Sequence, residues 1–514
     1  MPTPAFPKTL FATLLAAFAG AASALTPGDG DPDIVLYVPG SQANDKFFAP
    51  ALCSSNIHTY FQNYTSDPSK ATNNDYWAIY CSTDGSKVSG IVGTKKLWIS
   101  RRRLGASYVG LDALVKGTKL TYLEKPSTAA CTAFSGSFTS GGTTFNYDYS
   151  CTTVTPNITA TGSVSDVTPD AFRGGDNVPT GQAEIVASGI PNRNAIAGHI
   201  IGAPVTLLLR NALQYAQVLS GALPSQCAVP GSTTSANMDE TAACMPSLGK
   251  QQLASLFSGA VSDWNSFSVN VSGTAISLEQ VAARWASNGG SASYLKAPDD
   301  TTVHICRREN GAGQQVALLA TILQNPCLGN SAPRLVQPGS FTDVQLATSL
   351  GAEDSCLTDF NNGTTNFLPT AKGNRWAIGI QTTERNVSRS ANYRFIKIDG
   401  AAPTVEQVAL GKYPLWSEYG IQWMNNVTAD QGNLLRALVK YGQRPDNVNA
   451  RNQADIHSFG TAGYVALSAN GYAPDPVFNA ANPVTPYTHK RAGGGIDACT
   501  VPVVNPDYGT AELR

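Results

Sequence analysis

The sequence has little charge and, beyond its N-terminus, no long hydrophobic run. Only 14% of its 514 residues are charged, against about 25% in an average soluble domain. The formal net charge of −1 at pH 7 argues against a nucleic-acid partner held by bulk electrostatics. After the N-terminal segment there is no stretch of about 18 apolar residues, the length that a membrane-spanning helix needs. We therefore expect a protein that neither binds nucleic acid nor spans a membrane.

The common catalytic signatures are also absent. No G-x-S-x-G, HExxH or Walker A pattern occurs, so an esterase or a phosphatase would lack a recognisable nucleophile–base pair. No CxxC pair occurs, and the five histidines are scattered along the chain: His58, His199, His304, His457 and His489. Histidines scattered in this way, without a CxxC pair, disfavour a metal site. We predict no enzymatic activity, no metal and no cofactor.

The N-terminus has the pattern of a secretory signal peptide. Lys8 supplies a positive charge, "TLFATLLAAFAGAA" is a short apolar stretch, and "ASA" at Ala22–Ala24 is a small-residue cleavage site. The apolar run is too short to span a membrane. We predict that residues 1–24 are removed, that the mature chain begins near Leu25, and that it is periplasmic or extracellular.

Ten cysteines follow the predicted cleavage site, an even number that in an exported protein indicates disulfides. Metal binding is the competing interpretation. The sequence alone does not determine connectivity, so the pairing that we predict rests on closeness along the chain. The predicted bridges are Cys53–Cys81, Cys131–Cys151, Cys227–Cys244 and Cys306–Cys327, with Cys356 and Cys499 left for a long-range bridge.

Strand-like and helix-like segments alternate along the chain. The run "IVLYV" at Ile34–Val38 is apolar and β-branched, which is typical of a strand buried on both faces. The stretches "HIIGAPVTLLLRNALQYAQ" and "TVHICRRENGAGQQVALLATILQNP" each pass from a strand into a helix. Residues 116–159 are polar and strand-like, which predicts a β insertion, and Pro169 predicts the first turn of a further helix. The alternation predicts an α/β architecture.

Four loops lie at predicted strand-to-helix turns and read "GSQAN", "LGAS", "SVSD" and "RRENGAG". In α/β sheets, ligands bind outside the carboxyl ends of the strands, and the free N–H groups at helix N-termini favour anions there. Arg308, in the last loop, adds a planar guanidinium that is always charged. Each loop taken singly is equally typical of an ordinary helix entry. Together, with an arginine and an aspartate among them, they predict an anion site.

Five stretches resemble the periplasmic phosphate-binding proteins of bacterial ABC transporters, which have the type 2 periplasmic binding protein fold. They are "PGSQANDKFFAPAL", "LGASYVGLDAL", "GSVSDVTPDAF", "LASLFSGAVSDWN" and "RRENGAGQQ". The fourth is the most specific, because it is very similar to the family's IFxGxIxxWND stretch. The resemblance extends from Asp33 to about Trp416 and is interrupted by the insertion at 116–159.

The resemblance implies a set of ligand-binding residues, which are Ser41, Asn44, Ser107, Asp166, Arg308, Gly313 and Gln314. Arg308 falls on the family's phosphate-clamping arginine. Asp166 falls on the carboxylate that accepts the ligand's proton, and Gly313 on the glycine that offers a backbone N–H. The chain departs from the family where Ala312 replaces the loop serine and Gln314 replaces the threonine. At least two hydroxyl donors are absent as a result, and each hydrogen bond lost to a charged group is worth about 1.5–3 kcal/mol.

The resemblance also implies two lobes joined by a hinge. Lobe one would comprise residues 31–190 and 376–514, and lobe two residues 191–375. The expected function is capture of phosphate or a related oxyanion between the lobes, without catalysis and with an ABC transporter permease as a partner.

The competing hypothesis is a secreted structural or surface-interaction protein that keeps the fold but has lost ligand binding. The extra disulfides, the β insertion and the absent hydroxyls favour this second hypothesis. The presence of Asp166 and Arg308 favours the first.

Overall fold

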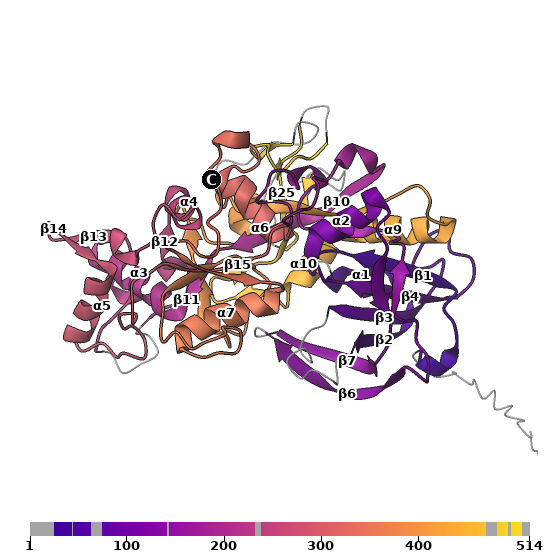
Figure 1. The fold of residues 1–514 in the computed structure, drawn as a ribbon, viewed down its shortest axis with the longest axis horizontal. Helices are drawn as coiled ribbons and strands as arrows, with labels where there is room; N and C mark the ends of the chain where they lie inside the picture. Colours follow the sequence, from indigo (N-terminus) through magenta and orange to yellow (C-terminus); the bar gives the residue numbers. More distant parts are fainter. Residues whose placement is uncertain are drawn as a thin grey trace, which may run out of the picture.

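Strands and helices form a mixed α/β fold around three larger sheets in the computed structural model (Figure 1). The predicted α/β class is therefore confirmed. No helix in the described part of the chain is long and apolar enough to cross a membrane. The predicted signal peptide and Asn44 lie outside the described residues. The structure describes residues 25–43, 45–62, 75–140, 143–231, 238–468, 481–491 and 495–505.

The first sheet holds the N-terminal strands and most of the predicted insertion. In spatial order its strands are β1 (Ile34–Pro39), β4 (Lys95–Arg102), β3 (Tyr76–Thr83), β2 (Ser55–Gln62), β7 (Thr143–Cys151) and β6 (Cys131–Ser140). The "IVLYV" run forms β1, which pairs in parallel with β4. The β6–β7 hairpin extends the sheet at the lower edge of Figure 1, and β5 (Leu120–Leu123) pairs separately with β8 (Val154–Ile158). The insertion is thus built of strands, as predicted.

The second sheet crosses the middle of the molecule and carries the third loop. Its strands in spatial order are β25 (Val484–Thr485), β24 (Tyr464–Leu467), β10 (Asn192–Gly202), β21 (Trp416–Trp423) and β9 (Ser163–Ser165), and β18 (Gln381–Thr382) also pairs with β10. A parallel bridge between Gly40 and Val164 joins the end of β1 to β9. The first and third loops therefore begin side by side.

The third sheet carries the arginine loop. Its strands in spatial order are β16 (Asp343–Ala347), β15 (His304–Arg308), β17 (Ala377–Gly379), β11 (Pro204–Thr206) and β19 (Tyr393–Phe395). β15 is buried along its whole length and runs parallel to both of its neighbours. Because the carboxyl ends of parallel strands meet at one edge, Arg308 lies beside Ala347.

Short two-stranded ladders and helices complete the described fold. The ladders pair β12 (Ser247–Leu248) with β20 (Lys397–Ile398), β13 (Ser268–Val271) with β14 (Thr274–Ser277), β22 (Ile456–His457) with β23 (Gly460–Thr461), and β26 (Tyr487–Thr488) with β27 (Val503–Val504). The α-helices are α1 (Asp45–Leu52), α2 (Ala106–Lys116), α3 (Leu207–Leu219), α4 (Lys250–Phe257), α5 (Leu278–Ser287), α6 (Gly313–Leu318), α7 (Leu350–Asn362), α8 (Val405–Ala409), α9 (Ala429–Gly442) and α10 (Pro445–Asn452).

The helix expected at Pro169 is only a single 3-10 turn, Pro169–Ala171. Pro169 does occupy its first position, as a proline can. The turn ends because Phe172 leaves the helical region, with φ −82° and ψ 64°. The chain after Asp166 is therefore a loop over the second sheet rather than a helix.

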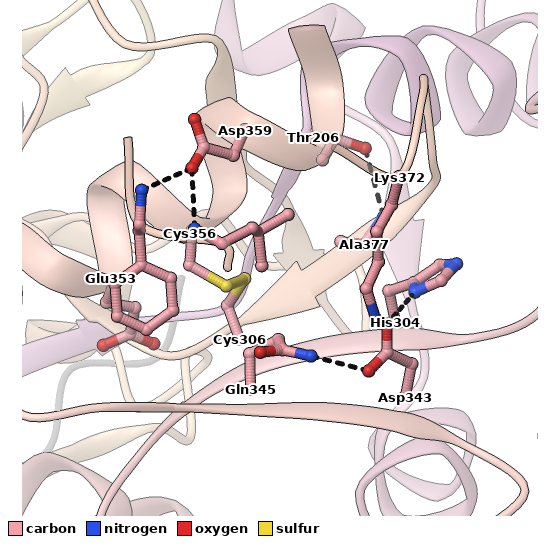
Figure 2. Close-up of a disulfide and its surroundings, with 12 residues drawn as sticks. Thr206, His304, Cys306, Asp343, Gln345, Glu353, Cys356, Asp359, Lys372 and Ala377 are labelled. Atoms are coloured by element: carbon pink, nitrogen blue, oxygen red, sulfur yellow. Dashed lines mark hydrogen bonds and ion pairs between the residues drawn. A yellow bond between two sulfur atoms is a disulfide. The ribbon is translucent and has the colours of Figure 1, made fainter. Parts of the chain in front are cut away.

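Two of the five predicted disulfides are wrong. The structure contains Cys53–Cys81, Cys131–Cys151 and Cys227–Cys244 as predicted, but it joins Cys306 to Cys356 and Cys327 to Cys499. Cys306 lies on the face of β15 that packs against α7, and Cys356 lies on that helix, so tertiary packing brings them together (Figure 2). The prediction paired cysteines that are close in sequence. It was wrong here because the loop and helix after β15 place Cys327 away from Cys306.

Candidate functional site

The first loop holds Ser41 in place through its backbone. Gly40 has φ +119°, and a Cβ there would lie 2.0 Å from the Val164 carbonyl oxygen, so the position requires glycine. The Ser41 N–H donates to that same carbonyl at 3.0 Å. The fully buried guanidinium of Arg101 donates to the Ser41 carbonyl at 2.5 Å and also to the Val38 carbonyl. These bonds direct the Ser41 hydroxyl toward the third loop.

Asp166, directly after β9, is the centre of the site and is only 1% exposed. The Ser41 hydroxyl donates to its Oδ1. The Ser107 hydroxyl lies 3.4 Å from its Oδ2 and accepts from its backbone N–H at 3.3 Å. Burial raises the pKa of Asp166, while the charge of His199 and the Ser41 hydrogen bond act in the opposite direction. Burial and the groups around this carboxyl therefore act on its charge in opposite directions.

The fourth loop packs directly on the second and third. The Tyr108 N–H, in the first turn of α2, donates to the Gly311 carbonyl at 3.1 Å. A Cβ at Gly313 would lie 2.6 Å from Ser107 Oγ and 2.8 Å from Asp166 Oδ2. Contacts this short exclude any side chain, so Gly313 lets the backbone of α6 approach the carboxylate.

Arg308 is anchored at the end of β15 and is 3% exposed. Its Nε donates to the Ala347 carbonyl at 3.1 Å, and its Nη2 donates to the Thr348 carbonyl at 3.0 Å. Its Nη1 lies 3.4 Å from Oε1 of Gln314. These contacts use three of the five N–H donors of a guanidinium. The charge of Arg308 is close enough to Asp166 to lower the pKa of that carboxyl.

A second buried carboxyl, Glu353 in the first turn of α7, lies near Arg308. Its Oε1 accepts the Ile380 N–H at 2.7 Å, and its side chain is 0% exposed. Burial raises the pKa of Glu353 well above its ordinary value, although the charge of Arg308 acts against this. Burial therefore acts against a negative charge on Glu353 beside Arg308.

The sequence analysis did not identify two residues of this cluster, His199 and Glu384. His199 lies in β10 with 0% exposure, and its ring stacks on Tyr464 with the centroids 5.3 Å apart. Its Nε2 is 3.2 Å from Glu384 Oε2, and its Nδ1 is 3.8 Å from Asp166 Oδ1. The available signal was a histidine inside the apolar run "AIAGHIIGA". That signal does not say which loop the ring faces.

Most of the predicted site residues come together. Ser41, Ser107, Asp166 and Gly313 are in direct contact, and Gln314 contacts Arg308. Asn44 lies outside the described residues. The role of these residues as ligand-binding groups stays a prediction.

Both arginines of "CRRENGAGQQ" are buried, but they serve different parts of the molecule. Arg307 is 1% exposed and donates to Asn310 Oδ1 at 3.2 Å and to Gln337 Oε1 at 3.1 Å. Arg308, on the other side of the strand, is the one whose charge acts on Asp166. Among the described residues, no group of three or more His, Cys, Asp or Glu side chains could hold a metal ion.

Comparison with known proteins finds solved structures that are similar to this chain. No family model and no curated protein matches the chain. The chain is similar to a putative phosphate ABC transporter substrate-binding protein with bound phosphate from Clostridium perfringens, with 11% identity, 82% of this chain and 98% of that chain covered, and a TM-score of 0.37. It is also similar to an ABC-type phosphate transport receptor from Vibrio cholerae (12% identity, 79% and 93% covered, TM-score 0.32) and to PstS from Borrelia burgdorferi (10%, 84% and 99%, 0.30). These are proteins of the kind that the sequence motifs resemble.

Proposed function

We propose that the protein is a solute-binding protein that captures phosphate or a related oxyanion between two lobes, one containing the first and second sheets and the other containing the third sheet. The observation that carries this proposal is that Asp166, after β9, and Arg308, at the end of β15, belong to different sheets yet adjoin the same loop. A Cβ at Gly313 would lie 2.8 Å from Asp166 Oδ2, and Gln314 Oε1 lies 3.4 Å from Arg308 Nη1. The charges of Asp166 and Arg308 also act on each other's pKa. An oxyanion between them would accept hydrogen bonds from the guanidinium. The hydroxyls of Ser41 and Ser107 and the N–H of Gly313 are the further donors at hand.

The charge of Asp166 predicts which oxyanion fits. An ionised carboxylate only accepts hydrogen bonds, and hydrogen phosphate carries a proton that it can donate. Sulfate at neutral pH has none, so it would face Asp166 as one negative charge against another in a buried site. Phosphate should therefore bind more tightly than sulfate, because sulfate is repelled by the carboxylate of Asp166.

Thermal denaturation with and without phosphate tests the proposal. A ligand at 100 times its dissociation constant stabilises the folded state by about 2.7 kcal/mol. Arg308→Ala should abolish the phosphate-dependent rise in Tm. Arg307→Ala is the matched control, since it removes the same charge from the same strand and should lower Tm while the rise with phosphate remains. No rise in wild-type Tm at millimolar phosphate would contradict the proposal.

A structural or surface-interaction role is the second candidate, and one observation favours it. The site side chains satisfy one another: the Ser41 hydroxyl bonds to Asp166, and Gln314 bonds to Arg308. In a protein that had lost its ligand, these contacts would simply be core polar contacts. This candidate predicts that Arg308→Ala and Arg307→Ala lower Tm and that phosphate changes neither.

We also propose export with cleavage after Ala24, to the periplasm or the outside of the cell, where an ABC transporter permease would receive the captured anion. The exported product should then have the mass of a chain beginning near Leu25. A product that retains residues 1–24 would contradict the export proposal and leave the anion site unaffected.

A further inference from the structure

His199 lies between two carboxylates at the centre of the proposed anion site. Its Nε2 is 3.2 Å from Glu384 Oε2, and its Nδ1 is 3.8 Å from Asp166 Oδ1. The ring is 0% exposed, and within the described part of the chain Nδ1 has no hydrogen-bond partner. Buried polar atoms ordinarily have one. Nδ1, the ring atom that faces Asp166, can therefore carry a proton that points toward this carboxylate.

The geometry favours the imidazolium over the neutral ring. A neutral ring that donates through Nε2 to Glu384 would turn the lone pair of Nδ1 toward the carboxylate of Asp166. Protonation of the ring removes this conflict, because an N–H then faces each carboxylate, and opposite charges this close favour the charged forms. Burial lowers the pKa of His199, but its hydrogen bond to Glu384 and the charges of both carboxylates raise it above the ordinary value. Burial also raises the pKa of Glu384, yet His199 brings it down to about 2.

The remaining groups around the ring are two tyrosines, one carboxyl and the lysine paired with it. They are Tyr464 on β24, Tyr419 on β21, and Asp455 after α10 with its ion-pair partner Lys46 on α1 at 2.8 Å. Burial raises the pKa values of both tyrosines well above 10, so neither ring carries charge at neutral pH. Burial raises the pKa of Asp455 to about 6, against the attraction of Lys46. Above that pH Asp455 is a further carboxylate that stabilises the imidazolium.

We propose that His199 is a specificity-determining residue of the site: as an imidazolium it keeps Asp166 ionised, and the site therefore selects oxyanions that carry a proton. This inference rests on the proposed anion-binding function. Without this neighbouring cation, the pKa of the buried Asp166 would rise further, because burial would then be opposed mainly by the Ser41 hydrogen bond and the charge of Arg308. A protonated Asp166 can donate a hydrogen bond, so it would accept sulfate as readily as phosphate.

Calorimetric titration of His199→Gln with phosphate and with sulfate tests the inference. The Gln amide can still donate to Glu384 but carries no charge. Loss of a neighbouring cation raises the pKa of an aspartate by about 1–3 units. At pH 6 the phosphate-to-sulfate affinity ratio should therefore fall by about tenfold or more relative to wild type. As the pH is raised further and Asp166 ionises, the ratio should recover toward that of wild type at the same pH.

His304→Gln is the matched control, because His304 also lies between two carboxylates but at the start of β15. It should leave the ratio unchanged. Wild-type binding with an unchanged ratio in His199→Gln would overturn this inference and leave the proposed function standing. Absence of phosphate and sulfate binding by folded wild-type protein would overturn both.

A second measurement does not depend on any variant folding. The ¹⁵N chemical shifts of the His199 ring in the anion-free wild-type protein report whether both nitrogens carry protons. We expect an imidazolium at pH 7. A neutral ring with a single protonated nitrogen at that pH would overturn the inference, whatever the protein binds.

Discussion

Two histidines of this protein each lie between two carboxylates, yet their surroundings differ. His304 opens β15, with Nδ1 2.9 Å from Asp343 Oδ2 and Nε2 3.3 Å from Asp300 Oδ1 (Figure 2 shows the Asp343 side). His199 has the same arrangement inside β10, at somewhat longer distances from its partners. The chemistry of the two clusters is therefore the same, and only their environments distinguish them.

The His304 cluster has spare cations and contact with water. Lys372 lies 2.6 Å from Asp343, and Arg375 lies 2.8 Å from Asp300, whose side chain is 44% exposed. Each carboxylate there keeps a positive neighbour if His304 is lost. This cluster is a partly solvated ion-pair network, of the kind whose single members contribute little to stability.

The His199 cluster is more deeply buried. Its Asp166 is 1% exposed, Arg308 is held by backbone carbonyls, and Lys46 is held by Asp455. The charges of His199 and Arg308 both act on Asp166, and of these two cations His199 is the one that also contacts Glu384. The comparison indicates that burial, more than residue type, determines how strongly a histidine between two carboxylates affects their charge.

Matched substitutions in the two clusters should separate specificity from stability. Asp166→Asn should reduce the preference for phosphate over sulfate by about ten- to a hundredfold, because the amide can donate where the carboxylate only accepts, and hydrogen bonds to charged groups are worth about 1.5–3 kcal/mol. Asp343→Asn should lower the free energy of unfolding by about 0.5–1 kcal/mol and leave the preference intact. Calorimetric titration and denaturant unfolding measure the two effects. Equal anion preference in Asp166→Asn and wild type would show that Asp166 does not contact the anion.

The close packing around Asp166 should make one glycine irreplaceable. Gly313→Ala would place a methyl group 2.6 Å from Ser107 Oγ, so the loop must shift, at a cost of about 1–3 kcal/mol. Phosphate binding should be lost as well. Gly189→Ala is the control, since a Cβ there meets nothing within 4 Å. Tm and calorimetry together check the prediction, which is contradicted if Gly313→Ala binds phosphate like wild type.

The pH dependence of stability should reveal the contribution of His199. The folded-state pKa of His199 is raised, so its contribution is complete below the unfolded value of about 6.5 and is lost as the pH rises through the folded value. Each unit of difference is worth about 1.4 kcal/mol. His199→Gln should therefore flatten the fall of Tm with pH above 6.5. Parallel Tm curves for His199→Gln and wild type would contradict the assignment.

Restoring a hydroxyl should produce the smallest effect. Gln314→Thr removes the amide oxygen that accepts from Arg308 and offers a hydroxyl donor instead. We expect phosphate binding to strengthen by about tenfold at most, since one neutral hydrogen bond contributes about 0.5–1.5 kcal/mol. Gln315→Thr, at the next buried position, should have no such effect on the calorimetric affinity. Weaker binding by Gln314→Thr would mean that Gln314 itself contacts the anion.

Much of the fold was predictable because it depends on local patterns. The apolar run at Ile34–Val38 forms a strand, and "LGASYVGLDAL" leads into α2. The polar stretch at 116–159 forms strands. The turn at Pro169 was predicted as a helix because Pro at a first position has the same local signature in a long helix and in a single 3-10 turn.

By itself, the sequence determined the α/β alternation, the loops that carry Ser41, Asp166 and Arg308, and the glycine that such a loop needs, because each depends on residues that are neighbours along the chain. Only the tertiary structure decided that Cys306 pairs with Cys356, and that His199 in the middle of an apolar strand faces Asp166. Contacts of this kind join residues distant in sequence, and they depend on the register of sheets and the packing of helices on them. Burial, which is a property of the whole fold, then shifts the pKa values of His199 and Asp166, and their mutual attraction opposes that shift.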